Sequence, residues 1–365
     1  MREERCINCM RRIHQGELRC PYCGFSQKPD RRYVYALHPG TILDGRYLIG
    51  RVLGQGGFGI TYVGFDRKLE MRVAIKEYFP HGMANRSASV SGRIAWNHSQ
   101  AEEKQGEKGV SEFLKEARRM AKLEDLPAVV RVRDTFAANG TAYLVMEYIE
   151  GETLKSRIEK SGPLSFPVCV RYLTPVMDSL ERMHRQEGLI HRDISPDNIM
   201  IRPDGRPCLL DLGAAKDLTA NTYSSRMVMK QGYSPLEQCT SGGKIRPWTD
   251  VYSMTATIYF SITGKQVPNV MTRAYRESLG KGADKTPEGE IDYTDAAGNP
   301  LPPAVQAVLR AGLEIHYIDR IQTMEELKCQ LIAACNPPKP PEPDGKKGSL
   351  ADKFKEMLGA RKKKT

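Results

Sequence analysis

Short β-prone runs alternate with glycine-rich and charged turns between residues 43 and 150. Runs of this kind, rich in β-branched and aromatic residues, are typical of antiparallel strands. The dipeptide Asn139-Gly140 between two apolar runs predicts a tight hairpin. Apolar side chains at helical spacing predict an amphipathic helix over residues 112–123. The predicted strands cover residues 47–52, 60–64, 72–75, 129–136 and 143–146.

Beyond residue 151 the spacing of apolar positions is mainly that of helices. A strand-rich segment followed by a helix-rich one predicts an α+β fold with a small and a large lobe. Residues 81–110 are polar, contain four glycines and are expected to form a long insertion before the first helix. The predicted helices cover residues 154–160, 168–185, 251–263, 303–311 and 324–334.

Composition places the chain among globular proteins, with 40% hydrophobic and 27% charged residues in a length of 365. That length suits about two domains. No apolar run reaches the roughly 18 residues that a membrane span requires. The first residues lack the apolar core of a signal peptide. We therefore expect a cytoplasmic protein without a transmembrane segment.

The net charge of +11 is concentrated in the two ends of the chain. Basic residues outnumber acidic ones in residues 1–37 and again in residues 336–365, and the body between them is nearly neutral. A neutral body argues against a core that binds nucleic acid in a sequence-specific way. The basic ends are instead expected to contact an acidic partner or an anionic surface.

Four of the nine cysteines form two CxxC pairs near the N-terminus, namely Cys6, Cys9, Cys20 and Cys23. Two such pairs can place four thiolates around one Zn²⁺ at about 2.3 Å. A pair of disulfides is the alternative, and it is disfavoured in a protein without a secretion signal. Four cysteine ligands leave no open coordination position, so the predicted zinc is structural.

A glycine-rich segment, Gly54 to Gly59, has the pattern GxGxxG with a predicted strand on each side. Loops without Cβ atoms let backbone N–H groups approach phosphates. Lys76 lies on the next predicted strand in the sequence Val-Ala-Ile-Lys, where an ammonium can reach phosphate oxygens. Glu116, on the predicted helix, offers the carboxylate to hold this lysine.

A second group of polar residues follows in the large lobe. The sequence His191-Arg-Asp-Ile-Ser-Pro-Asp-Asn198 places a carboxylate, Asp193, five residues before an amide. Asp211 follows eighteen residues after Asp193, in the sequence Asp-Leu-Gly. Phosphoryl transfer requires a phosphate clamp, metal ligands and a group that takes the hydroxyl proton, and these elements supply each part in order.

In this order the motifs resemble those of eukaryotic-like serine/threonine protein kinases, and in particular those of a bacterial group. The resemblance implies the two-lobed protein kinase fold and transfer of the γ-phosphoryl group of ATP to Ser or Thr hydroxyls of protein substrates. The resemblance covers residues 43–335, the expected kinase domain, with lobes 43–150 and 151–335. Cysteine spacing and composition divide the rest into a zinc-ribbon-like module at 1–30, a linker at 31–42, a Pro-rich linker at 336–348 and a basic amphipathic tail at 349–365.

The resemblance also implies the roles of individual residues. Lys76, held by Glu116, contacts the α and β phosphates, and Asp193 accepts or orients the hydroxyl proton. Asn198 and Asp211 hold Mg²⁺ or Mn²⁺. The residues implied to bind the nucleotide are Leu53, Gly54, Gln55, Gly56, Gly57, Phe58, Gly59, Thr61, Ala74, Lys76, Met146, Glu147, Tyr148 and Met200.

The chain departs from the family pattern at Ser195, where most such kinases carry a lysine that neutralises charge on the transferring phosphoryl group. Loss of one such donor can lower a rate by about 10²–10³-fold. Lys216 and Lys230 are candidates to replace it. Of the structural residues, Asp250 is expected to brace the catalytic loop, and Glu237 is expected to pair with an arginine of the large lobe, Arg320.

Regulation is implied by Arg192, which in such kinases pairs with a phosphate on the activation segment, here residues 211–237. The candidate autophosphorylation sites are Thr222, Ser224 and Ser225. An ATP-binding scaffold with little activity, acting through the ribbon and basic tail, is the alternative function. A nucleic-acid-binding protein is a third, although Tyr22 and Phe25 are the only aromatic residues near the cysteines. A dimer is a further expectation.

Overall fold

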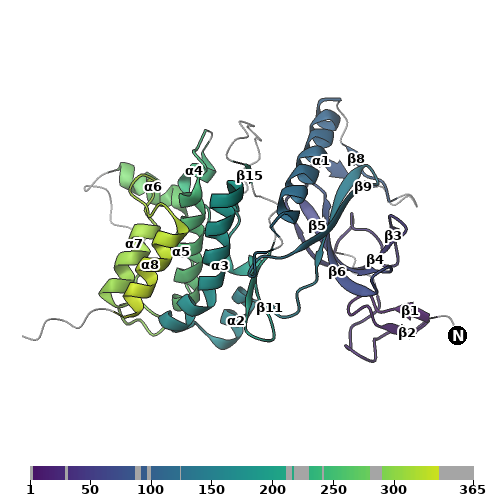
Figure 1. Ribbon diagram of the computed structural model, residues 1–365, viewed down its shortest axis with the longest axis horizontal. Helices are drawn as coiled ribbons and strands as arrows, with labels where there is room; N and C mark the ends of the chain where they lie inside the picture. The colour runs from purple at the N-terminus through teal and green to yellow at the C-terminus, as the bar shows by residue number, and fades with distance from the viewer. Residues whose placement is uncertain are drawn as a thin grey trace, which may run out of the picture.

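The structure, a computed structural model, describes residues 3–28, 32–86, 92–96, 100–123, 125–210, 216–217, 230–240, 242–279 and 290–336. A small lobe built on one antiparallel sheet lies beside a larger helical lobe, and a two-stranded module lies at the far end of the small lobe (Figure 1). This is the predicted α+β arrangement.

The sheet of the small lobe has six strands in the order β3-β4-β5-β6-β10-β9, each antiparallel to its neighbours. The predicted hairpin is confirmed, because Asn139 and Gly140, which join the last two strands, have φ angles of 54° and 74°. Positive φ at both central residues matches the twist of a two-residue hairpin. The strands are β3 (Ile42–Leu43), β4 (Tyr47–Gly56), β5 (Gly59–Asp66), β6 (Met71–Tyr78), β9 (Val132–Ala138) and β10 (Thr141–Glu147).

The helix of the small lobe, α1 (Gln100–Ala121), is longer than predicted. Its first half lies within residues 81–110, the segment that we expected to precede the helix, so the predicted start of the helix at residue 112 was wrong. This segment also contains the short strands β7 (Ala84–Asn85) and β8 (Ala95–Trp96). A Cβ atom at Gly106 would overlap the Trp96 ring, and one at Gly109 would overlap Tyr78. These two glycines therefore allow aromatic rings to approach the helix and do not mark a loop.

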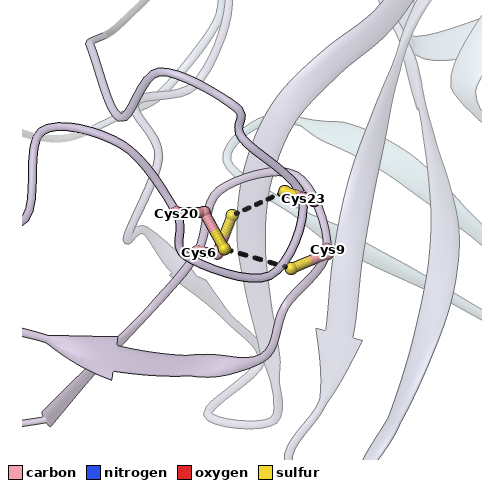
Figure 2. A group of neighbouring side chains, drawn as sticks. All are labelled: Cys6, Cys9, Cys20 and Cys23. Atoms are coloured by element: carbon pink, nitrogen blue, oxygen red, sulfur yellow. Dashed lines mark hydrogen bonds between the residues drawn. The ribbon is translucent and has the colours of Figure 1, made fainter.

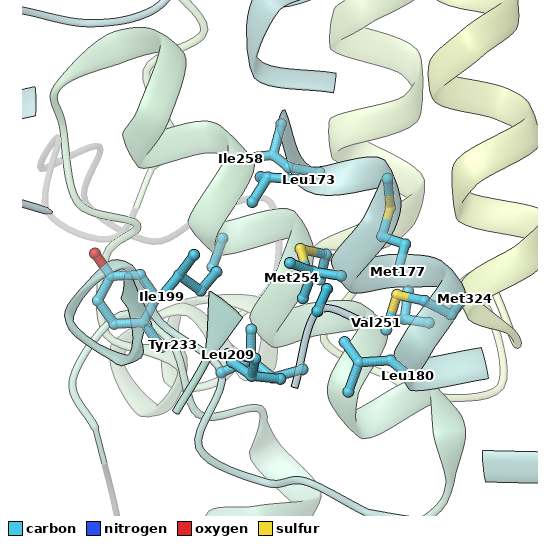
Figure 3. Close-up of a cluster of buried hydrophobic side chains, with 14 of the residues drawn as sticks. Leu173, Met177, Leu180, Ile199, Leu209, Tyr233, Val251, Met254, Ile258 and Met324 are labelled. Atoms are coloured by element: carbon cyan, nitrogen blue, oxygen red, sulfur yellow. The ribbon is translucent and has the colours of Figure 1, made fainter. Parts of the chain in front are cut away.

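The large lobe is built around α5 (Pro247–Thr263), most of whose residues are buried. Figure 3 shows side chains of α5, including Val251, Met254 and Ile258, packed with those of neighbouring elements. We predicted five helices of this lobe, α2, α3, α5, α7 and α8, and missed α4 and α6. The other helices are α2 (Leu154–Ser161), α3 (Phe166–Glu187), α4 (Leu236–Cys239), α6 (Val270–Ser278), α7 (Pro303–Gly312) and α8 (Met324–Cys335).

Short strands of the large lobe position the loops that face the small lobe. A three-stranded sheet has the order β11-β13-β14, and β12 pairs with β15. A 3-10 turn, η1 (Pro196–Asn198), lies directly before β13. The strands are β11 (Glu152–Thr153), β12 (Leu189–Ile190), β13 (Ile199–Ile201), β14 (Pro207–Leu209) and β15 (Lys216–Asp217).

The N-terminal module consists of β1 (Glu3–Arg5), β2 (Arg12–His14) and the loops that carry the four cysteines. It packs on the small lobe through Met10, which is buried in a cluster with Val63 and Phe65 of β5. The backbone N–H of Arg51 donates to the Ile7 carbonyl at 2.7 Å. A Cβ at Gly50 would overlap Met10 and the same carbonyl, so this close contact requires glycine.

Residues 33–40, expected to act as a linker, also lie against the sheet. Leu37 is buried and its backbone N–H donates to the Tyr62 hydroxyl at 3.0 Å. Tyr35 stacks on Phe79 with a centroid distance of 5.8 Å. The N-terminal module is thus connected to the small lobe by a packed segment.

Candidate active site between the lobes

The glycine-rich segment forms the turn between β4 and β5. Gly56 is opposite Gly59 in the strand register, and Gly57 and Phe58 form the tip. Cβ atoms added to Gly54, Gly56 or Gly57 would meet no described atom within 4 Å. The backbone of the turn therefore borders open space in which N–H groups can approach a phosphate. The tip is fixed by the segment that follows β6, because the Phe58 carbonyl accepts a hydrogen bond from Phe79 N at 2.9 Å.

Lys76 lies in the middle of the sheet. In the register of β6 it is opposite Thr61 of β5 and Leu144 of β10, and only 7% of it is exposed. Glu116 lies on α1, which packs against β9 and β10. The two residues are thus on adjoining elements of the small lobe, and their pairing stays a prediction.

The residues expected around the adenine come from both lobes. Met146 is opposite Ala74 in the register of β10 and β6, and Ala74 and Met200 pack against the apolar cluster that contains Met146. Tyr148 packs with the cluster around Met10. Of the other expected residues, Leu53, Gly54, Gln55 and Gly56 lie on β4, Gly59 and Thr61 on β5, and Glu147 at the end of β10.

The catalytic loop follows β12 and is held from below by Asp250. The carboxylate of Asp250 accepts hydrogen bonds from the backbone N–H groups of His191 and Arg192, both at 2.8 Å. His184 Nε2 lies 2.8 Å from the same carboxylate. Burial would raise the pKa of Asp250, but the hydrogen bond with His184 and the nearby imidazoles keep it below the usual value. Asp250 therefore stays ionised and braces the loop, as predicted.

Arg192 has a φ angle of 69°, which is rare for a residue with a side chain. Gln238 Nε2 donates to the Arg192 carbonyl at 2.8 Å and so helps to hold this conformation. Burial lowers the pKa of Arg192, and the carboxylates of Asp250 and Glu116 oppose this effect.

Asp193 and Asn198 face each other at the end of this loop. The Asn198 amide nitrogen donates to the Asp193 carbonyl at 2.7 Å and to its Oδ2 at 2.8 Å. Because the nitrogen is turned toward Asp193, the amide oxygen of Asn198 faces away from it. Amide oxygens are among the ligands that Mg²⁺ prefers, so the Asn198 oxygen has the chemistry of a ligand, while the second predicted ligand, Asp211, lies outside the described residues.

Ser195, the residue that departs from the family pattern, is completely buried. Lys230 Nζ donates to its hydroxyl at 2.6 Å. The same ammonium lies 3.2 Å from Asp197 Oδ2. Of the two lysines named as candidates, Lys230 therefore contacts the catalytic loop, whereas the side chain of Lys216 lies outside the described part of the chain.

Several predicted residues lie outside the described residues, namely Asp211, Thr222, Ser224 and Ser225. The basic tail at 349–365 and residues 337–348 do as well. Sequence reasoning did not anticipate His184 and Gln238, which support the catalytic loop. No motif marks either residue, because each acts through one hydrogen bond across a large distance in sequence.

The four predicted zinc ligands converge at the N-terminal module. Figure 2 shows the side chains of Cys6, Cys9, Cys20 and Cys23 pointing toward a common centre. All four sulfur atoms lie within 4.8 Å of one another, with Cys6 to Cys23 at 3.7 Å and Cys9 to Cys20 at 3.6 Å. Tetrahedral zinc with bonds of about 2.3 Å requires sulfur atoms about 3.8 Å apart. The cluster therefore fits the predicted ion.

Comparisons with known proteins agree with this geometry. The family model for the protein kinase domain matches residues 47–330. The chain is 32% identical to serine/threonine-protein kinase F of Synechocystis over 66% of its length and 48% of that protein's length. It is 30% identical to serine/threonine-protein kinase PknA of Nostoc over 82% of its length and 50% of that protein's.

A solved structure described as PpkA-294 apo form matches with a TM-score of 0.64 and 30% identity, covering 81% of this chain and 99% of that one. The chain therefore belongs to the protein kinase family and has its two-lobed fold. It spans about half the length of the curated relatives it matches. None of the helices in the described ranges combines the length and hydropathy that a membrane crossing requires.

Proposed function

We propose that the protein is a serine/threonine protein kinase that transfers the γ-phosphoryl group of ATP to hydroxyl groups of protein substrates. The observation that carries the proposal is the contact of Asp193 with Asn198 in a loop braced by Asp250. The relatives named above, all serine/threonine-protein kinases, support the same activity. None of these comparisons favours the scaffold with little activity.

In the proposed reaction, the Asp193 carboxylate accepts the proton of a substrate Ser or Thr hydroxyl. A bond forms between that oxygen and the γ-phosphorus, while the bond from the γ-phosphorus to the β,γ-bridging oxygen breaks. ADP leaves with the electron pair of the broken bond. Lys76 and the backbone of the glycine-rich turn hold the phosphates during this transfer.

Protein kinases in general use Mg²⁺ with ATP. We assign Asn198 and Asp211 as its ligands here, with Mn²⁺ as a substitute. When bound, the cation neutralises charge on the β and γ phosphates. The nucleotide site is assigned to the residues on β4, β5, β6, β10 and β13 named above, with Glu116 holding Lys76.

The experiment that tests this function is the intact mass of the protein before and after incubation with Mg-ATP. Wild-type protein is expected to gain mass in steps of one phosphoryl group, because Thr222, Ser224 and Ser225 are proposed autophosphorylation sites next to Arg192. Peptide mapping should place phosphate within residues 211–237. The Lys76→Met variant is the control and should gain none.

A lack of mass gain in wild-type protein, together with no transfer to an added protein substrate, would contradict the kinase function. It would favour the ATP-binding scaffold instead. Phosphate found only outside residues 211–237 in an active preparation would contradict the regulatory part alone.

We also propose that the cysteine cluster holds one structural Zn²⁺ per chain. Metal analysis of the purified protein should give a ratio of about one, because four thiolates complete a tetrahedral site. The Cys20→Ser variant should lose most of the zinc and unfold residues 3–28, since so short a segment cannot form a core alone. Full zinc content in Cys20→Ser would disprove the four-thiolate site, and Cys329→Ser, at an exposed cysteine on α8, is the matched control.

The remaining proposals concern location and partners. We propose a cytoplasmic protein in which the basic tail at 349–365 contacts an acidic partner or an anionic surface, and in which a dimer can form. The kinase domain is assigned to residues 43–335, the module to residues 1–30 and the linker to residues 31–42. Met10 of the module and Leu37 of the linker pack on the small lobe.

A further inference from the structure

The position two residues after Asp193 holds a serine, and the ammonium of Lys230 reaches this serine from another part of the chain. We propose that Lys230 is a catalytic residue whose ammonium stabilises negative charge on the phosphoryl group during transfer. This inference rests on the proposed kinase function. The contact that motivates it is the hydrogen bond from Lys230 Nζ to Ser195 Oγ at 2.6 Å.

Ser195 belongs to the same short loop as the proposed base and metal ligand. The backbone N–H of Asn198 donates to the Ser195 carbonyl at 3.0 Å, and the Asn198 amide contacts Asp193 at 2.8 Å. An ammonium that contacts Ser195 and Asp197 therefore lies on the same short loop as the proposed base and the proposed metal ligand. Cations placed where charge develops are a principal source of rate enhancement in phosphoryl transfer.

Asp197 is shared between two lysines. It lies 3.2 Å from Lys230 through Oδ2 and 3.2 Å from Lys155 of α2 through Oδ1. One carboxylate thus faces two ammonium groups, so Asp197 does not by itself neutralise Lys230. An anionic phosphoryl group is a complementary ligand for this ammonium.

The ammonium has three N–H donors, and Ser195 and Asp197 are its acceptors within the described residues. One donor can therefore point toward a phosphoryl oxygen without loss of either contact. The Lys230 side chain is 30% exposed, so it borders the open side of the loop while Ser195 beneath it is buried.

The backbone of Lys230 is held in place. Its N–H donates to Ser234 Oγ at 2.9 Å, and its carbonyl accepts from Tyr233 N at 3.0 Å and from Ser234 N at 2.9 Å. Ser253 of α5 donates to the Tyr233 carbonyl at 2.8 Å and ties this turn to the core. A cation held in advance needs little reorganisation in the transition state, which is the condition for strong electrostatic catalysis.

The test compares Lys230→Met with wild-type protein in two measurements. In steady-state kinetics, kcat is expected to fall by about 10²–10³-fold while KM for ATP changes by no more than about threefold. In binding assays, affinity for Mg-ADP with aluminium fluoride, which mimics the planar phosphoryl group, should fall by a similar factor. Affinity for Mg-ADP alone should stay unchanged.

A lysine that only ties residues 230–234 to the catalytic loop would give a different result. Its replacement would lower the melting temperature of the protein. It would also weaken the binding of Mg-ADP by the same factor whether or not aluminium fluoride is present. The double variant Ser195→Lys with Lys230→Ser separates the catalytic role from the structural role further. It exchanges the two contacting side chains, so an ammonium is again present at this place but is carried by residue 195. It should recover at least about tenfold of the lost kcat.

Lys160→Met is the matched control, since Lys160 is an exposed lysine of α2 that pairs with Glu152. A kcat of Lys230→Met within about threefold of an active wild type would overturn the inference and leave the kinase function intact. If wild-type protein transfers no phosphate, the kinase function fails. The affinity for Mg-ADP with aluminium fluoride then tests the role of Lys230 separately. Equal affinities of wild-type protein and Lys230→Met would refute the proposed contact of Lys230 with the phosphoryl group.

Discussion

Replacing Asp193 with asparagine is expected to lower the rate of phosphoryl transfer by about 10²–10⁴-fold, the range that a positioned general base contributes. The amide has the shape of the carboxylate but cannot accept the hydroxyl proton. The hydrogen bond from Asn198 Nδ2 can be kept by the new amide oxygen, because the present acceptor is Asp193 Oδ2 at 2.8 Å. The fold and the loop should therefore survive the substitution.

The measurement is the initial rate of phosphate incorporation into an added protein substrate, with intact mass as a second readout. Asp204→Asn is the matched control, because Asp204 lies in the turn between β13 and β14 and pairs with Arg206, two residues away. Mg-ATP affinity should be similar in all three proteins. An unchanged rate in Asp193→Asn would remove Asp193 from the reaction and leave phosphoryl transfer to be explained otherwise.

Replacing Arg320 with methionine is expected to destabilise the large lobe by about 3–5 kcal/mol, the cost of removing one partner from a buried ion pair. Its guanidinium contacts the Glu237 carboxylate through Nη1 at 2.7 Å and Nη2 at 3.2 Å, which confirms the predicted pair. Its other donors bind the carbonyls of Glu314, Trp248 and Ile315. All five N–H groups are therefore used, and the variant leaves a buried carboxylate without its cation.

Urea unfolding followed by tryptophan fluorescence measures this effect, since Trp248 lies next to the pair. Arg276→Met is the control, because Arg276 pairs with the largely exposed Glu290 and should cost no more than about 1 kcal/mol. Adding Glu237→Gln to Arg320→Met should restore part of the stability, because it removes the isolated charge. Equal losses in the two arginine variants would contradict a special role for the buried pair.

The elements that were predicted correctly are those in which local pattern and tertiary packing agree. The hairpin at Asn139-Gly140 and the helix that begins at Met324 carry their own turn and capping residues, such as Thr323, whose hydroxyl accepts from Glu326 N at 3.1 Å. Motifs with fixed spacing predicted the two CxxC pairs and the catalytic loop for the same reason. In these cases neighbouring residues contain the necessary information.

The elements that were missed depend on residues far away in the sequence. The first half of α1 is polar and contains two glycines, and its helical form is understandable only once Trp96 and Tyr78 are seen beside them. The contact of Ser195 with Lys230 joins positions 35 residues apart. The sequence named Lys216 and Lys230 as candidates for this role, but it gave no way to choose between them. Spacing alone cannot reveal which distant side chain completes a site.

The contact of the N-terminal module with β4 has a consequence for synthesis on the ribosome. Residues 3–28 emerge before residues 47–66, which form the surface beneath Met10 and the donor to the Ile7 carbonyl. Domains fold progressively from the N-terminus as the chain is made. During that interval the proposed zinc ion must hold the module folded by itself. The sheet of the small lobe thus forms next to an N-terminal module that is already folded. A shortage of metal during translation would therefore affect newly made chains more than mature ones.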